Sequence, residues 1–325
     1  MTTYIDATTL KKMLTDGAEL ALLDVREDGQ FGEGHLLFAV PMPYSSLEAR
    51  LDAQLPRRST RTVLVDDADG VAERAAARLA TPGYSDVAVV AGGVAAWAAA
   101  GYEIFKGVNV PSKAFGEMVE HQAHTPSISA AELQAMFERG EDLVVVDGRT
   151  PEEFQRMNIP HGMSVPNAEL IYRIHDIAPS PHTTVVVNCA GRTRSIIGAQ
   201  TLLNAGIPNK VVALRAGTMG WSLAGSTLER GTNRPFPAVS PEGLRQARAT
   251  AARMAQAYGI KRLDLATLEA WKQDTSRSLY VLDVRGKDEY VAGHLPGALH
   301  APGGQLVQAT DAWVAARGGR IVLTD

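Results

Sequence analysis

The chain of 325 residues contains the same short pattern three times. Each copy has an apolar run that ends in Asp-x-Arg, and an aromatic residue follows a few positions later. The aspartates of the three copies, Asp24, Asp147 and Asp283, lie 123 and then 136 residues apart. Solenoid repeats are only about 20–50 residues long, so this spacing indicates repetition of whole domains. The chain is therefore expected to consist of copies of one domain.

Two further landmarks keep the same register. An apolar run of similar composition ends in each copy at one common position, which is Asp67 in the first copy, Cys189 in the second and Asp325 in the third. A Gly-x3-Trp motif begins at Gly93 and again at Gly217. Three landmarks with nearly equal offsets make a chance repeat implausible.

The second copy alternates short apolar runs with helical patterns. The expected strands are 143–146, 184–188 and 211–214, and the expected helices are 130–139 and 195–204. This alternation implies βαβ crossovers and a parallel sheet with helices on both faces. Ligands bind such sheets at the carboxyl ends of the strands, which is where Cys189 falls.

Two stretches connect the copies, and each is expected to contain a helix, over about 112–121 and 242–257. The predicted organisation is a first domain over 1–107, a linker over 108–126, a second domain over 127–232, a linker over 233–262 and the start of a third domain over 263–325. The third copy stops at the position of Cys189. We expect it to be truncated, so that the chain is a fragment of a longer protein or a partner covers its open face.

Cys189 is the only cysteine, and it stands where a strand should turn into a helix. Gly191, Arg192 and Arg194 follow within five residues. Loop N–H groups, the positive end of a helix and two arginines all favour the thiolate, which is the nucleophilic form. A buried structural cysteine is the alternative, but that role needs neither the glycine nor the arginines.

The composition narrows the class of protein. A formal net charge of −4 without a basic run gives no reason to expect nucleic acid. No apolar run reaches the ~18 residues that span a bilayer, and no secretory signal is visible at the start. A single cysteine excludes an intramolecular disulfide and argues against a cysteine-built zinc site. We expect a cytoplasmic protein that uses no metal and no cofactor.

The motifs resemble those of rhodanese-type sulfurtransferases that are related to thiosulfate sulfurtransferase and carry tandem rhodanese domains. The segment from Cys189 to Arg194, with Ser195 opening a helix, is similar to the active-site loop of that family. The Asp-x-Arg pattern is similar to the start of the domain, and the segment from Gly217 to Trp221 to its end. The resemblance implies three-layer α/β/α domains, each around a parallel sheet. It also implies a cysteine that accepts sulfane sulfur as a persulfide and passes it on.

The expected chemistry is nucleophilic catalysis by Cys189. Its thiolate attacks the outer sulfur of thiosulfate, and cyanide or a thiol then removes that sulfur. The leaving group needs preorganised donors, for which Arg194 is the first candidate and Arg192 the second. The predicted substrate-binding residues are Ala190, Gly191, Arg192, Thr193, Ser195 and Arg149. A small anionic sulfur donor, a thiol or cyanide acceptor and a protein sulfur acceptor are the candidate partners.

Three other residues receive structural interpretations. Arg149 is able to reach the opening of the Cys189 site, but its recurrence in copies without a cysteine favours an ion pair that stabilises the domain. His161 is expected to make a structural hydrogen bond, because His35 and His294 are taken as its counterparts in copies without a cysteine. Trp221 is expected in the core.

The first copy has an acidic loop in place of the cysteine loop. Asp66, Asp67 and Asp69 are expected to satisfy the helix N-terminus themselves and to repel an anionic donor. A cation site on these carboxylates is the alternative, although their spacing does not match an EF-hand loop. We expect the first and third copies to be inactive and to serve as scaffold or interface.

Two other functions compete with sulfur transfer from small molecules. A cysteine-dependent phosphatase or arsenate reductase uses a similar loop, but such loops resemble Cys-x5-Arg, whereas Cys189 and Arg194 form Cys-x4-Arg. A persulfide relay or redox sensor docked to a partner protein would use the same accessible thiol. A gain of one sulfur atom in the mass of the protein after treatment with thiosulfate would distinguish sulfur transfer from these two functions.

Overall fold

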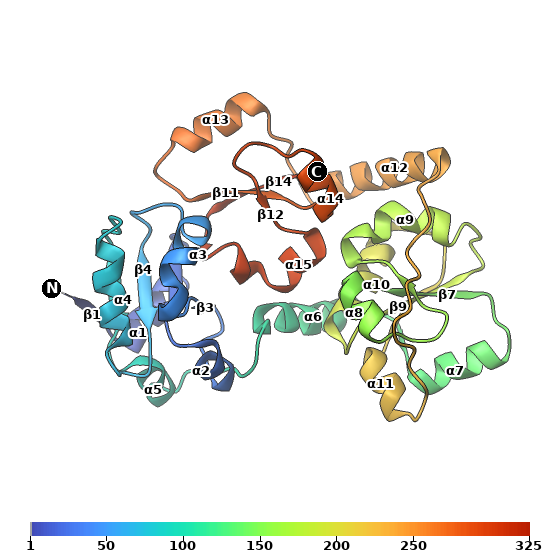
Figure 1. Cartoon of the computed structure of the whole chain (residues 1–325), viewed down its shortest axis with the longest axis horizontal. Coiled ribbons are helices and arrows are strands. Elements are labelled where there is room, and N and C mark those ends of the chain that lie inside the picture. The colour runs from blue at the N-terminus through green and yellow to red at the C-terminus, as the bar shows by residue number, and fades with distance from the viewer. Residues whose placement is uncertain (1) are drawn as a thin grey trace. The chain divides into compact units, whose positions relative to one another are not determined.

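The structure, a computed structural model, describes residues 2–325 (Figure 1). Three sheets with helices against them confirm the expected repeated α/β architecture. The chain divides into two compact units, one of residues up to 111 together with 263–325, the other of residues 112–262. The first and third copies thus share a unit, which the repeat pattern alone did not predict.

The unit of residues 112–262 contains one parallel five-stranded sheet with the order β6-β10-β9-β7-β8. Its strands are β6 Ser127–Ile128, β7 Leu143–Asp147, β8 Met163–Ser164, β9 Thr184–Asn188 and β10 Val211–Leu214. Its helices are α7 Ala130–Glu138, α8 Pro151–Arg156, α9 Leu170–Ile177, α10 Thr193–Ala205, α11 Gly217–Leu223 and α12 Pro241–Ala257. The helix α6, Val110–Ala123, leads into this unit.

Two apolar layers cover the two faces of this sheet. On one face, side chains of α9 and α10, such as Leu170 and Leu202, pack on alternate residues of β9. On the other face, Leu133 of α7 and Trp221 of α11 pack on the residues between them. β9 is buried along its whole length, as expected of a central strand of Val and Thr residues with helices on both sides. Trp221 lies in the core, as predicted.

Local signals fix the ends of the helices near Cys189. Thr150 caps α8 in a capping box with Glu153, and Pro151 occupies the first turn. α10 ends at Gly206, whose left-handed φ of 68° suits a residue without a side chain.

The first copy repeats this architecture. Its strands are β1 Thr3–Ile5, β2 Leu20–Asp24, β3 Val40–Pro41, β4 Thr62–Val65 and β5 Val87–Val90, and its helices are α1 Ala7–Met13, α2 Asp28–Glu33, α3 Leu47–Gln54, α4 Val71–Ala80 and α5 Gly93–Ala99. Even the tryptophan hydrogen bond recurs. Nε1 of Trp97 donates to Glu103 O at 3.1 Å, and Nε1 of Trp221 donates to Thr227 O at 2.9 Å.

The third copy is built against the first. Its helices are α13 Leu265–Gln273, α14 Lys287–Ala292 and α15 Gly303–Gln308, and its strands are β11 Leu279–Asp283, β12 Leu299–His300, β13 Ala316–Arg317 and β14 Arg320–Thr324. β11 pairs with β12 and β14, but β13 leaves this sheet and pairs antiparallel with β2 of the first copy. Tyr280 and Leu282 join the core under α3 and α4.

The first copy thus covers part of the sheet face of the third copy, which we expected to be uncovered. Along β14, by contrast, Ile321 and Leu323 are 48% and 57% exposed. Among the described residues, β14 forms ladder pairs with β11 alone. Within the same part of the chain, no helix combines the length and the apolarity that crossing a bilayer requires.

The hydroxyl of Tyr280 links the two copies, and its removal is expected to weaken their unit. Burial raises the pKa of Tyr280, so the hydroxyl stays protonated. It donates to Gln54 O at 2.9 Å and accepts from Ala316 N at 3.1 Å. Tyr280→Phe should leave the Ala316 N–H unpaired and cost about 1–3 kcal/mol in the free energy of unfolding. Urea unfolding measures the loss, and Tyr4→Phe, at an exposed tyrosine, should change it by less than about 0.5 kcal/mol.

Candidate active site

Cys189 directly follows β9, at the carboxyl end of the central strand, and it is 1% exposed. The start of α11 holds its carbonyl group. Thr218 N donates to Cys189 O at 2.9 Å, and Met219 N donates to Ala190 O at 3.1 Å. Because the peptide unit is planar and trans, carbonyls that point to α11 turn the following N–H groups the other way. The N–H groups of Ala190 and Gly191 therefore point away from α11.

Gly217 makes this arrangement sterically feasible. It has a φ of 51°, and a Cβ there would lie 2.2 Å from Cys189 O. Gly93 has a φ of 57° in the first copy, and its Cβ would lie 2.1 Å from Asp66 O. The recurring Gly-x3-Trp motif thus marks a close approach of two backbone segments, with the tryptophan anchoring the helix that follows.

The N-terminus of α10 lies just beyond Cys189, and no side chain caps it. The N–H groups of a first helical turn lack partners within the helix and carry partial positive charge. Ser195 is buried, and its hydroxyl donates to Arg192 O at 2.8 Å instead of accepting from the helix end. Ala190, Gly191 and Thr193 are half-buried around the same point. These donors can accommodate negative charge on a group attached to Cys189.

In the first copy the same donors are already occupied. Oδ2 of Asp66 accepts from Ala72 N at 2.9 Å, and its Oδ1 accepts from Ala68 N at 2.9 Å. Asp69 accepts from Val71 N at 3.2 Å. Asp66 and Asp69 therefore bind the helix start as the sequence predicts, whereas the third predicted carboxylate, Asp67, accepts from Arg26 and Gln30 instead.

Arg149 forms a buried fork with Asp147. Its Nε and Nη2 each donate to one carboxylate oxygen at 2.8 Å, and Nη2 also donates to Met157 O. Arg26 makes the matching contacts in the first copy, and its remaining Nη1 donates to Asp67 at 2.8 Å. Among residues 2–325, Nη1 of Arg149 has no such carboxylate. By the shared geometry, it is expected to face residue 189.

Arg194 forms a bidentate ion pair with Glu153 of α8. Its Nη1 and Nη2 lie 2.7 and 2.8 Å from the two carboxylate oxygens. Burial alone would lower the pKa of Arg194, but the hydrogen bonds and charge of Glu153 raise it, and Cys189 adds to the rise. Burial alone would raise the pKa of Glu153, but Arg194 lowers it. Arg194 therefore stays protonated close to the thiol.

Arg192 has different partners. Its Nη1 lies 3.0 Å from Glu117 Oε1, and its Nη2 donates to Glu120, both on α6. The hydrogen bond to Glu120 raises the pKa of Arg192. The structure thus places this guanidinium on α6, and its predicted contact with substrate has to compete with these ion pairs.

A family model described as a rhodanese-like domain matches residues 6–100, 129–224 and 264–325. The chain belongs to the rhodanese-like domain family. The resemblance inferred from the three motifs is therefore confirmed.

A crystal structure described as thiosulfate sulfurtransferase from Pseudomonas aeruginosa is 51% identical to this chain, with a TM-score of 0.97. The match covers 99% of this chain and 62% of that one, so this chain spans less than two thirds of that protein. The Alr3790 protein from Anabaena sp. is 30% identical, over 32% of this chain and 93% of that one, with a TM-score of 0.31. A comparison with curated proteins gives no match.

The rhodanese-like copies correct the assignment of His161. Backbone hydrogen bonds join His35 to Phe105 in the first copy and Asn158 to Glu229 in the second, so Asn158 stands in the place of His35. His35 and His294 stack on Phe31 and Tyr290, which do correspond. His161 is exposed in a turn with a φ of 65°. The alignment of His161 with His35 was wrong because Gly162, next to His161, resembles the glycine that precedes His35 in the first copy.

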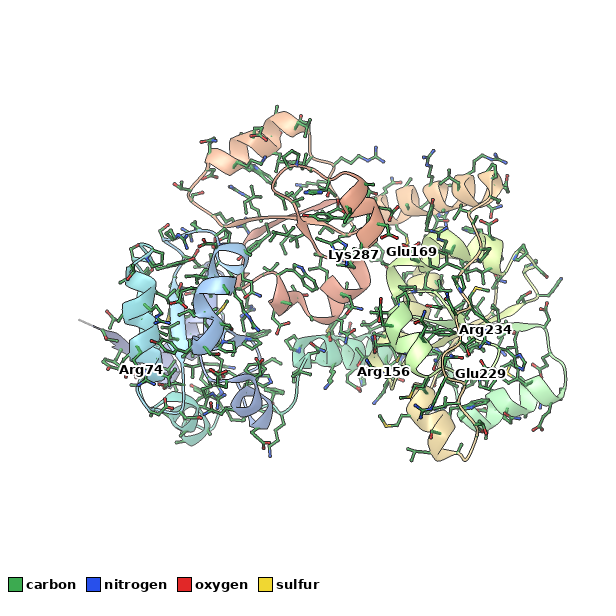
Figure 2. All side chains as sticks on the ribbon, in the orientation of Figure 1. Arg74, Arg156, Glu169, Glu229, Arg234 and Lys287 are labelled. Carbon is green, nitrogen blue, oxygen red and sulfur yellow. The ribbon has the colours of Figure 1, made fainter. Side chains whose placement is uncertain are left out.

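Arg234 supports Asn158 in the second copy. It donates to Asn158 Oδ1 at 3.0 Å and to Gly162 O at 2.7 Å, and it pairs with Glu229 (Figure 2). In the second copy, Arg234 and Asn158 thus stabilise the part of the domain that contains His35 in the first copy.

Sequence reasoning did not find Glu153, Glu117 or Glu120. Glu153 lies in a Thr-x-x-Glu capping box, a pattern that indicates only the start of a helix. Nothing in this pattern indicates that Glu153 also forms an ion pair with Arg194. Glu117 and Glu120 lie on a linker helix, and no sequence signal ties them to Arg192.

The two Gly-x3-Trp glycines offer a matched test of the Cys189 loop. Gly217→Ala and Gly93→Ala should each destabilise the chain by about 1–3 kcal/mol, because alanine is strained at these φ angles and lacks space. Only Gly217→Ala should also change the rate at which the lone thiol is alkylated. Thermal unfolding and alkylation rates measure both effects. Equal alkylation rates in the two variants would refute the view that Gly217 shapes the loop.

Proposed function

We propose that this chain is a sulfurtransferase in which Cys189 accepts sulfane sulfur from thiosulfate, or a similar donor, and passes it to cyanide or a thiol. The observation that carries the proposal is the position of Cys189, directly after the central strand β9 and just before the uncapped start of α10. The family and the 51% identity to a protein described as thiosulfate sulfurtransferase support it.

In the first half-reaction the Cys189 thiolate attacks the outer sulfur of thiosulfate. A new S–S bond forms to Cys189, the S–S bond of thiosulfate breaks, and sulfite leaves with the electron pair. We assign the stabilisation of the departing oxyanion to Arg194 and the N–H groups of residues 190–194, because such a leaving group needs preorganised donors. They also favour the negative charge of the resulting persulfide.

In the second half-reaction the acceptor attacks the outer sulfur of the persulfide. Cyanide leaves as thiocyanate and a thiol as its own persulfide, and the Cys189 thiolate returns in either case. This sequence is ping-pong nucleophilic catalysis. A protein thiol is a further candidate acceptor. The cycle needs a reduced thiol, so we propose a cytoplasmic location.

The proposed roles of the other residues follow from their contacts. Arg149 holds the end of β7 through Asp147 and turns its remaining nitrogen toward the pocket. Ala190, Gly191, Thr193 and Ser195 shape the ring of donors, and Arg192 joins when α6 releases it. We propose domain limits of 1–107, 127–232 and 263–325, with linkers at 108–126 and 233–262. The three segments that match the family model support these limits.

The first copy is proposed to be a scaffold without activity. The Asp67 carboxylate accepts hydrogen bonds from Arg26 and Gln30, and the Asp66 carboxylate accepts from an N–H group at the start of α4. The third copy carries Asp325 at the same position. Neither residue is a sulfur nucleophile.

The proposal is tested by the intact mass of the protein after treatment with thiosulfate. Wild-type protein should gain about 32 Da, one sulfur atom on an activated thiol, and cyanide should remove it. Cys189→Ser should gain nothing, because a hydroxyl is a far weaker nucleophile. Absence of the gain in wild-type protein, with release of phosphate from a generic ester, would favour a phosphatase. A gain without useful turnover would favour a persulfide relay.

Removal of Arg194 is expected to slow the first half-reaction. Arg194→Ala should cost about 2–4 kcal/mol of transition-state stabilisation, seen as lower kcat/KM for thiosulfate. The variant also leaves the Glu153 carboxylate without its ion-pair partner, so Arg194→Ala/Glu153→Gln separates the two effects. If the double variant recovers the wild-type rate, Arg194 acts only by neutralising Glu153, and its assignment as a donor is wrong.

A further inference from the structure

The helix α6 packs directly on the loop that carries Cys189. Gly116, in the middle of α6, is buried against Thr193 at the start of α10. A Cβ at Gly116 would lie 2.8 Å from Thr193 Cγ2 and 3.4 Å from Thr193 Cα. Glycine weakens a helix interior relative to alanine. Its presence here is explained by the close approach, which a larger residue would prevent.

The same face of α6 carries two carboxylates that bind the loop. Residue 120 follows residue 116 by four positions and residue 117 by three, so the three residues lie within an arc of about 100° on one side of the helix. Glu117 lies 3.0 Å from Arg192 Nη1, and Glu120 accepts from Nη2. The loop is thus fastened to α6 by a steric contact at Gly116 and an ionic contact at Arg192, both within the unit of residues 112–262.

We propose that α6 is a lid on the Cys189 loop, and that Glu117 and Glu120 determine which reagents pass it. With the lid closed, these carboxylates occupy Arg192 and add negative charge at the mouth, so the site discriminates against anionic reagents. With the lid open, Arg192 is free to bind the anion. The inference rests on the proposed function only in taking Cys189 as the reacting thiol.

The burial and exposure of the groups fit such a lid. Cys189 is 1% exposed, so a donor reaches its Sγ only if something moves. The side chains of Arg192 and Glu117 are 51% and 55% exposed, and that of Glu120 is 26% exposed. Ion pairs this open to water are weak and are screened by salt. The ionic contact of Arg192 with Glu117 and Glu120, which forms the latch of the lid, is therefore weak enough to open.

Alkylation of the lone cysteine tests the lid without any sulfur chemistry. Gly116→Ala should push α6 from Thr193 and raise the rates with neutral iodoacetamide and anionic iodoacetate alike, by roughly threefold or more. Glu117→Gln/Glu120→Gln should raise the ratio of the iodoacetate rate to the iodoacetamide rate by roughly threefold to tenfold, because two negative charges leave the mouth.

Matched controls come from the same chain. Gly29→Ala replaces another helical glycine, whose Cβ would meet nothing within 4 Å. Glu242→Gln removes an exposed ion pair with Arg245 on α12. Neither should change the alkylation rates. Circular dichroism establishes that each variant is folded.

Wild-type protein supplies a test that needs no variant. Its iodoacetamide rate should rise as salt increases from about 0.02 to 0.5 M, because screening opens the latch while the reagent itself is neutral. An unchanged iodoacetamide rate in folded Gly116→Ala overturns the lid. A salt-independent wild-type rate, or an unchanged rate ratio in the double glutamine variant, overturns the latch. Failure of thiosulfate to add sulfur, with these responses intact, would reject the proposed function and leave the lid standing.

Discussion

The site depends on the buried ion pair between Asp147 and Arg149. Both side chains are at most 3% exposed, and loss of either partner would leave an unpaired buried charge, typically at a cost of about 3–5 kcal/mol. The pair joins three pieces of chain. Arg149 also holds Met157 O, and Asp147 accepts from Asn188 Nδ2 at 2.7 Å, one residue before Cys189. The fork thus holds the end of the central strand, and together with the contacts of α11 to Cys189 O and Ala190 O it positions the thiol.

Asp24 and Arg26 form the same fork in the first copy, so the contrast between the two copies lies in what the fork faces. The first copy supplies its own anion, Asp67, and fills the helix donors with Asp66. The second copy has Cys189 at that position and an uncapped helix. One framework thus holds either an internal carboxylate or a thiol able to carry a charged group. A shared scaffold explains why copies without a cysteine retain the Asp-x-Arg pattern.

Sequence predicted the features that depend on local patterns. The repeat, the parallel sheets and the strand that ends at Cys189 follow from period, composition and motif, and the helices of both linkers lie close to where they were expected. The contacts of Arg192 with α6 and of Arg194 with Glu153 join residues 41 to 75 positions apart. No periodicity signals such pairs. The register of His161 failed because a short motif was matched without its hydrogen bonds, which the structure supplies.

The pairing of β13 with the sheet of the first copy shows that a domain defined by duplication differs here from a domain defined by packing. By descent, the chain is a series of duplicated segments. By packing, residues up to 111 and residues after 262 belong together, because Ala316 pairs with Ala21 and Tyr280 lies in the same core as Leu51. Cutting the gene at the boundaries of duplication would therefore divide a compact unit. The second copy, which lies between these two segments in the sequence, keeps a sheet and a core of its own.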